Sequence, residues 1–320
     1  MLYLIFTNFI VFLSIFLLLK FKKKSLINRF NKNLEPHNYN DNIIPLGGVI
    51  LITLIFLNYK YFSLELLISC LLIFLLGLSS DLKIFKSPVA RFIMMIFVVG
   101  IYIYFSNTII SQNNFPIIYK LMNNKLFNFI FLLVCILIII NGCNFIDGVN
   151  NNLNFYFLLF NISILYIKYI HAIDFEINIL LIIFAFFFLY LNYKNIIMFG
   201  DNGAYLIGFL CALEIVQLTN EIQVLSKYFA ILLLAYPSYE VLFSIIRRTG
   251  RSLLPDEKHL HLLLVRKNNQ NHFKTSLQLN SLNLIIFSIG SIFYNDDLII
   301  VFLIFLYLIT YNFYHYYLSR

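Results

Sequence analysis

Long apolar runs recur along the whole chain, and this repetition constrains the fold more than any other feature. Most are roughly 17 to 22 residues long, about what a helix needs to cross a hydrocarbon layer of about 30 Å. Only 12% of the 320 residues are charged, where a soluble domain carries about 25%. We therefore predict an all-α, polytopic integral membrane protein. About eleven transmembrane helices are expected, over 2–19, 43–59, 62–79, 89–106, 126–140, 153–170, 175–192, 203–219, 222–244, 277–293 and 297–318.

The basic residues are distributed unevenly over the loops that these spans create. Most of the 23 Lys and Arg residues follow odd-numbered spans or lie at the C-terminus. Basic residues near span ends concentrate on the cytoplasmic side. We therefore expect the N-terminus outside, the C-terminus in the cytoplasm, and a multi-pass protein of the cell (inner) membrane. The net charge of +8 follows from this bias and does not indicate nucleic-acid binding. The opposite side holds only Lys60, Lys120, Lys125, Lys168 and Lys227.

No internal repeat or linker divides the chain, which predicts a single membrane-embedded domain over 1–320. The first apolar run lacks a preceding basic residue and a following cleavage site, so we expect a retained anchor instead of a signal peptide. The four cysteines have no metal or redox spacing, and no disulfide is expected. They are Cys70, Cys135, Cys143 and Cys211.

Polar residues and glycines gather at the span ends that this topology places in the cytoplasm. Carboxylate and amide oxygens suit Mg²⁺, which keeps substrate phosphates in its shell, and Arg and His suit phosphate oxygens. We therefore expect a phosphate-handling site at the membrane–cytoplasm boundary. The stretches are PLGG (45–48), GLSSDLKIFKSPVAR (77–91), NGCNFIDGVNNN (141–152), MFGDNGAY (198–205) and RRTGRSLLPDEKHLHLLLVRK (247–267). The residues that they place on this face are Asp81, Asp147, Asp201, Arg91, Arg247, Arg248, His259 and His261.

These residues also have structural alternatives. Asp201 or Asn202 would serve as the N-cap of the span that follows, and Asp147 would do the same for its own following span. Arg247 would act as a positive-inside anchor. Glu240 lies inside the run 222–244, where a carboxylate is costly without a partner, and Arg247 is the expected partner.

The motifs and their order resemble the polyprenyl-phosphate N-acetylhexosamine-1-phosphate transferase family, also called glycosyltransferase family 4. NGCNFIDGVNN is similar to the family's N-A-x-N-x-x-D-G-x-[DN]-G, and FGDNGAYLIGF is similar to F-x-G-D-x-G-[SA]-x-x-x-G. AYPSYEVLFSIIRR and PDEKHLHLLL resemble a subgroup with Y-P-x-x-E and H-L-H signatures. The family includes the enzyme that makes the first lipid intermediate of peptidoglycan and those that start O-antigen and teichoic acid synthesis.

The resemblance implies a reaction between two phosphate-bearing substrates. A sugar-1-phosphate would pass from a UDP-N-acetylhexosamine, or a related UDP-sugar, to polyprenyl (undecaprenyl) phosphate, with release of UMP. Mg²⁺ is the implied cofactor, with Mn²⁺ as the alternative metal. The subgroup signatures favour the start of a surface polysaccharide, such as the O-antigen of lipopolysaccharide, over peptidoglycan in cell wall biogenesis. Relatives are commonly dimers, which makes a homodimer one option for this chain.

The resemblance also implies a role for each candidate residue. Asp201 would be the Mg²⁺ ligand, with Asn144 as a second oxygen ligand or a diphosphate contact. Asp147 and Asn150 would lie around the nucleotide, and Asp81 would complete the catalytic carboxylates. The phosphate contacts would be Arg91, Arg247, His259 and His261, supported by the basic residues of 247–251.

Three positions depart from the family pattern. The family's Asp-Asp pair is Ser80-Asp81 here, although polyprenyl phosphate is largely ionised at neutral pH and needs no base. Asn151 replaces a glycine. This indicates an unusual backbone angle at this position, because Asn tolerates such angles next best after glycine. Leu262 replaces the third histidine of some relatives.

Two other functions are alternatives to a transferase. A transporter would place its binding groups near the bilayer midplane, often within internal repeats, whereas the polar residues here crowd one boundary. An inactive family member that serves as a membrane scaffold has Ser80 as its only support.

Overall fold

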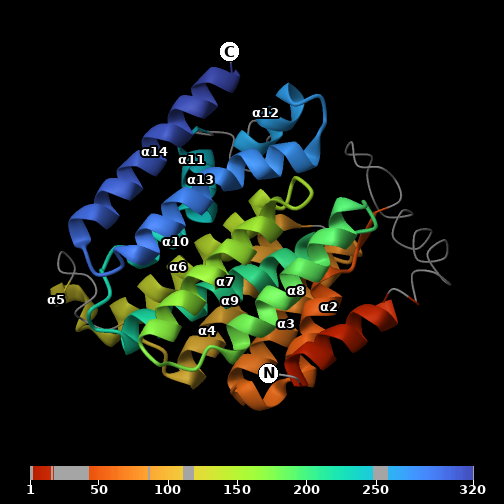
Figure 1. The fold of residues 1–320 in the computed structure, drawn as a ribbon. Coiled ribbons are helices and arrows are strands. Elements are labelled where there is room, and N and C mark those ends of the chain that lie inside the picture. The colour runs from red at the N-terminus through yellow and green to blue at the C-terminus, as the bar shows by residue number, and fades with distance from the viewer. Residues whose placement is uncertain are drawn as a thin grey trace.

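The structure is a computed structural model that describes residues 3–15, 17, 43–85, 87–110, 119–247 and 259–319. These residues are almost entirely helical (Figure 1). The helices are α2 (Gly47–Leu57), α3 (Leu64–Asp81), α4 (Pro88–Ser106), α5 (Tyr119–Met122), α6 (Lys125–Ile146), α7 (Asn152–Ile170), α8 (Glu176–Tyr193), α9 (Gly200–Glu221), α10 (Phe229–Leu233), α11 (Ala235–Arg247), α12 (Leu260–Lys267), α13 (His272–Ile292) and α14 (Asp297–Ser319). The strands are β1 (Ile44–Pro45) and β2 (Ile197–Met198).

Seven of the described helices are long and apolar enough to cross a membrane, namely α3, α4, α6, α7, α8, α9 and α14. They coincide with seven of the predicted runs, which confirms an all-helical membrane protein. The helix at Tyr3–Ile15 and α2 are shorter apolar helices. The count of eleven spans and the orientation of the termini remain predictions. All four cysteines are free.

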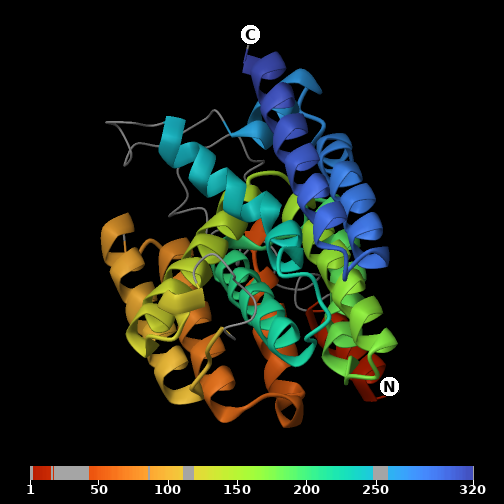
Figure 2. The same ribbon diagram turned by 90° about the vertical axis from the view of Figure 1, so that its left-hand side faces the viewer.

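The prediction of one continuous span over 222–244 is wrong. Residues 222–228 precede the helical part, α10 ends at Leu233, and α11 begins at Ala235. Pro237 in the first turn of α11 explains the break, because proline has no N–H to donate to the carbonyl of Leu233. Figure 2 shows α11 slanting across one end of the bundle, and its Tyr239 and Phe243 rings contact Tyr311 on α14.

Helix α9 is the centre of the fold, with α2, α3 and α6 packed against it. The most apolar window of α9 is 78% buried, more than in any other of the seven spanning candidates. Glycine permits this close packing, since a Cβ on Gly208 would lie 2.6 Å from the Cα of Ile140 on α6. The first turn of α9 is therefore held in a fixed position relative to the ends of its neighbours.

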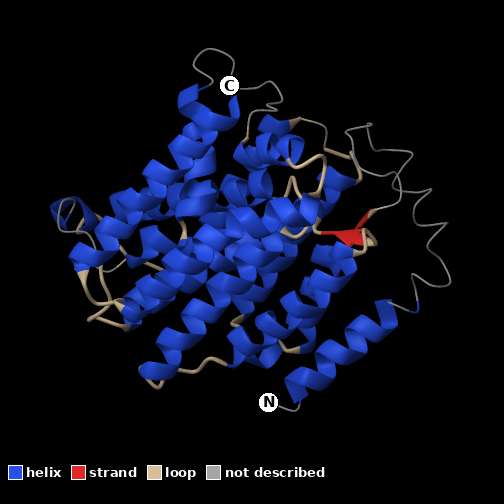
Figure 3. Ribbon diagram, turned by 45° about the horizontal axis from the view of Figure 1, so that its top comes forward, coloured by secondary structure: helices blue, strands red, loops and turns tan. Residues whose placement is uncertain are grey.

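A short parallel pair joins the two segments that lead into α2 and α9. Ile44 pairs with Ile197 and Pro45 with Met198, and Figure 3 shows the pair in red at the edge of the helical body. The PLGG stretch therefore lies beside MFGDNGAY. Helices α3, α6 and α8 end near the point where α9 begins, and their connecting loops form the candidate site described next.

Candidate active site

Asp81 at the C-terminal end of α3 caps the N-terminus of α9. Its Oδ1 accepts a hydrogen bond from the backbone N–H of Asp201 at 2.9 Å, and its Oδ2 accepts one from Asn202 at 3.0 Å. The side-chain amide of Asn202 donates to Oδ2 of Asp81 and to the carbonyl of Pro45. Gly200 allows the close approach, with φ at +68° and a Cβ position only 2.9 Å from Asp81 Oδ2. Both oxygens of Asp81 are thus engaged in holding the first turn of α9.

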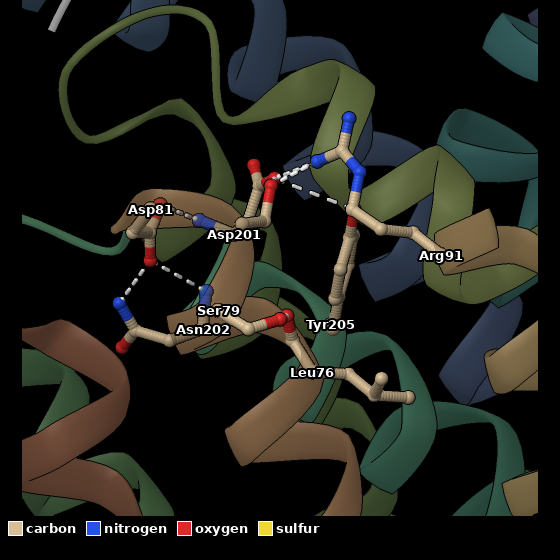
Figure 4. A network of polar contacts seen from close by, with 8 residues as sticks. Leu76, Ser79, Asp81, Arg91, Asp201, Asn202 and Tyr205 are labelled. Atoms are coloured by element: carbon tan, nitrogen blue, oxygen red, sulfur yellow. Dashed lines mark hydrogen bonds and ion pairs between the residues drawn. The ribbon is translucent and has the colours of Figure 1, made fainter. Parts of the chain in front are cut away.

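The carboxylate of Asp201 faces α4 and pairs with Arg91 (Figure 4). The distance from Arg91 Nη1 to Asp201 Oδ2 is 2.8 Å, and 25% of the Asp201 side chain is exposed. Ser80 donates to the same Oδ2 and accepts a hydrogen bond from Arg91. The hydroxyl of Tyr205 also reaches Oδ2, at 3.4 Å. The alternative in which Asp201 is the N-cap of its own helix is wrong, because the cap comes from Asp81.

Asp147 lies at the C-terminal end of α6, where it forms the C-cap of that helix. Burial, followed by the charges of Asp201 and Asp81, raises the pKa of Asp147 well above its usual value, although a backbone hydrogen bond from Gly200 lowers it. The three carboxylates from separate loops are therefore close enough to repel one another. Asp147 does not cap α7, whose N-cap is Asn151.

The asparagines after Asp147 have structural contacts. Asn151 adopts φ of +65°, which confirms the predicted left-handed backbone at this position. The amide of Asn150 donates to Asn195. Asn152 is fully buried and donates to the carbonyl of Ile146 and to the hydroxyl of Tyr236, and it accepts from Asn280. Asparagines are common throughout the chain, so no pattern in the sequence indicates this role.

Asn144 is partly exposed on the last turn of α6, before Asp147. The other predicted residues of this site come from the region around α12.

His259 and His261 are buried and lie against the end of α6. The ring of His259 is 5.1 Å from that of Phe145, and the two histidine rings stack at 5.5 Å. A Cβ on Gly148 would lie 2.5 Å from Nε2 of His261, so this nitrogen points to the loop of Asp147. Burial lowers the pKa of His261. The structure thus brings both histidines to the same loop as one of the three carboxylates.

Glu240 pairs with His259, and the predicted pairing with Arg247 is corrected accordingly. The distance from Glu240 Oε2 to His259 Nδ1 is 2.9 Å, and the glutamate is 1% exposed. Arg247 instead contacts His315 on α14 at 2.9 Å and lies over the ring of Phe243. Helical spacing suggested Arg247, whereas the true partner comes from a separate segment that no local pattern connects to α11.

Arg248 and the rest of the predicted basic group up to 251 lie outside the described residues. Within the described part of the chain, no group of three His, Cys, Asp or Glu residues is arranged to hold a metal ion by itself.

The comparison with protein families agrees with this arrangement. Residues 63–219 match the model of glycosyl transferase family 4, a segment that contains Asp81, Arg91, Asp147 and Asp201. No curated protein shows a significant match to the chain. The chain belongs to glycosyl transferase family 4, the family of polyprenyl-phosphate hexosamine-1-phosphate transferases.

Proposed function

We propose that this protein transfers a sugar-1-phosphate from a UDP-N-acetylhexosamine, or a related UDP-sugar, to undecaprenyl phosphate and releases UMP. The product would begin a cell-surface polysaccharide. The observation that carries the proposal is the meeting of Asp81, Asp147 and Asp201 with Arg91 at one end of the bundle. A site that joins two phosphate-bearing substrates needs both signs of charge, acidic groups for a cation and basic groups for the phosphates.

The basic side of this site is suited to phosphate. Arg91 uses Nη1 on Asp201 and Ser80, while its Nε is buried and has no hydrogen-bond partner. An unpaired buried N–H is costly, and a phosphate oxygen would satisfy it. His261 offers Nε2 beside Gly148, and His259 stacks against it. The family resemblance also implies a phosphate contact for Arg247, whereas its contact with His315 on α14 supports a structural role.

The acidic side fits a Mg²⁺ ion that shares its shell with substrate. All three hydrogen bonds to the carboxylate of Asp201 reach Oδ2, so Oδ1 faces no donor among the described residues. Mg²⁺ typically takes one or two protein carboxylates together with substrate phosphates. We assign Asp201 as the ligand, with Asn144 as a second oxygen ligand. When bound, the ion would offset the negative charge of the two substrates and of the departing UMP.

The residues of this chain would then direct one displacement at phosphorus. An oxygen of the lipid phosphate attacks the phosphorus that bears the sugar, and the bond from that phosphorus to the UMP oxygen breaks. UMP leaves with the bonding electrons. Because the acceptor phosphate is already ionised at neutral pH, no proton needs to be removed from it. Arg91 and the two histidines would hold the phosphate oxygens in line. Asp81 would act by fixing the turn that carries Asp201.

An apolar cavity supports a lipid acceptor. It has a volume of about 180 Å³ and lies between α6, α9, α10 and α11. On α6 its lining ends at Ile139, which at 1.5 Å per residue is about 12 Å along the helix from Asp147. The first isoprene units of an acceptor would suit this space if its phosphate lies at Asp147.

A donor panel tests the proposal. Purified protein in lipid nanodiscs would be supplied with undecaprenyl phosphate, Mg²⁺ and a series of UDP-sugars, and UMP release would be measured. We expect release with at least one UDP-N-acetylhexosamine, dependent on both the lipid and the ion. Absence of release with every donor, from protein with an intact unfolding transition, would support the inactive scaffold instead.

A further inference from the structure

A buried carboxylate on α11 faces both histidines of the candidate site. Glu240 is 1% exposed. Each of its two carboxylate oxygens faces the Nδ1 atom of one histidine. Oε2 is 2.9 Å from Nδ1 of His259, and Oε1 is 3.9 Å from Nδ1 of His261. A single carboxylate therefore spans two histidines that come from outside its own helix.

The first of these contacts fixes one histidine. A carboxylate accepts hydrogen bonds, so Nδ1 of His259 carries a proton and Nε2 is the nitrogen left for a ligand. Nε2 donates to a phosphate oxygen when the ring holds a second proton there, as an imidazolium. A side chain that determines which nitrogen is protonated also determines how the ring is oriented. The ring contact between His259 and Phe145 ties this orientation to the end of α6.

The second contact is incomplete. Glu240 Oε1 and His261 Nδ1 are both buried, and neither has a hydrogen-bond partner. A buried unpaired donor and acceptor are each costly, and these two face one another. A shift of about 1 Å would bring them within hydrogen-bonding distance. Hydrogen bonds of catalytic groups are often long before the substrate binds and shorten when it does.

We propose that Glu240 is a positioning residue that aims Nε2 of His259 and of His261 at the substrate phosphates, with the contact to His261 closing when the donor binds. This inference rests on the proposed function. It explains why a carboxylate is retained at a fully buried position next to apolar helices, where an unpaired charge would be strongly destabilising. Glu240 itself does not touch the substrate in this account.

The test combines kinetics with a structural readout on Glu240→Gln. In the kinetic arm, we expect kcat/KM for the donor sugar to fall at least about ten-fold, mainly through KM if ground-state phosphate contacts are lost. Glu240→Gln added to the double variant His259→Ala, His261→Ala should be no worse than that double variant alone, because Glu240 acts only through those two rings. Losses that multiply, or an unchanged kcat/KM in Glu240→Gln, would overturn the proposal.

Glu214→Gln is the matched control. Glu214 is a partly buried carboxylate in an ion pair, with Lys168 at 2.6 Å, but it lies in the far half of α9 from Asp201. Its loss should lower the thermal unfolding midpoint and leave the kcat/KM of the folded enzyme unchanged. A fall in kcat/KM equal to that of Glu240→Gln would mean that an ion-paired carboxylate far from the site matters equally, and would contradict a positioning role.

The structural arm does not depend on transferase activity. Nitrogen NMR of protein labelled with ¹⁵N at its six histidines should show His259 protonated at Nδ1 in the wild type and a changed signal in Glu240→Gln. UDP with Mg²⁺ should shift the Nδ1 signal of His261 only when Glu240 is present. Unaltered histidine signals in Glu240→Gln would refute the inference, whereas absence of UMP release by the wild type would refute the proposed function alone.

Discussion

Asp81 and Asp201 are 120 residues apart in the chain, and the carboxylate of the first accepts a hydrogen bond from the backbone N–H of the second at 2.9 Å. This contact connects the end of α3 to the beginning of α9. It separates the two acids by role, because Asp81 uses both oxygens on backbone and amide donors while Asp201 keeps one oxygen toward the loops.

Asp201→Asn should abolish turnover while the protein still expresses and folds. The amide keeps the shape of the side chain but removes the charge that a divalent cation requires. We expect a fall in UMP release of at least about 100-fold, the order seen when one group that stabilises a transition state is lost. Asp174→Asn, at an exposed position between α7 and α8, is the control and should keep full activity.

Asp81→Ala should destabilise the fold as well as the reaction. The substitution leaves the N–H groups of Asp201 and Asn202 without their acceptor, and loss of a helix cap typically costs about 1 to 2 kcal/mol. The free energy of unfolding in detergent should fall by this amount. If Asp81→Ala retained wild-type stability and lost only activity, a direct catalytic role would replace the capping role.

Ser80→Asp should be tolerated. The new carboxylate would still accept from Arg91 but would no longer donate to Asp201, and the added negative charge would strengthen cation binding. The Mg²⁺ concentration that gives half-maximal UMP release should therefore fall, with kcat kept within a few-fold. Complete loss of activity would show that Ser80 is misplaced in this account.

The raised pKa of Asp147 predicts how the stability of the folded protein depends on pH. Its pKa is raised in the folded protein, chiefly by burial. Between the ordinary value of about 3.9 and the raised value, the native state holds a proton that the unfolded chain releases, so stability falls as pH rises through that window. In EDTA, Asp147→Asn should therefore unfold at a higher temperature than the wild type at about pH 8, with the gap closing toward about pH 4. A gap that did not change with pH would contradict the raised pKa of Asp147 in the folded protein.

Gly148→Ala should impair the site without unfolding the protein. The added Cβ would lie 2.5 Å from Nε2 of His261 and would displace that ring. We expect kcat/KM to fall about ten-fold or more, as for other misplaced catalytic groups. Gly100→Ala is the matched control, because its Cβ would meet only Phe129 at 3.7 Å, and it should remain fully active.

Much of this arrangement was predictable from the sequence for physical reasons. Apolar length alone indicated the seven helices, and the replacement of glycine by Asn151 indicated a left-handed backbone that the structure confirms. The break before Pro237 was missed because the apolar run continues through it. The pairing of Glu240 with His259 and the capping of α9 by Asp81 depend on tertiary packing between distant segments, which hydrophobic periodicity does not encode.

The fate of a labelled donor phosphate tests the central claim most directly. A UDP-sugar that carries ³²P in the phosphate attached to the sugar would be incubated with the protein, undecaprenyl phosphate and Mg²⁺. If the site transfers sugar-1-phosphate, the label will move into the lipid fraction while unlabelled UMP appears in the water phase. Label that remains in the water phase as UDP, while the sugar alone enters the lipid, would contradict the account.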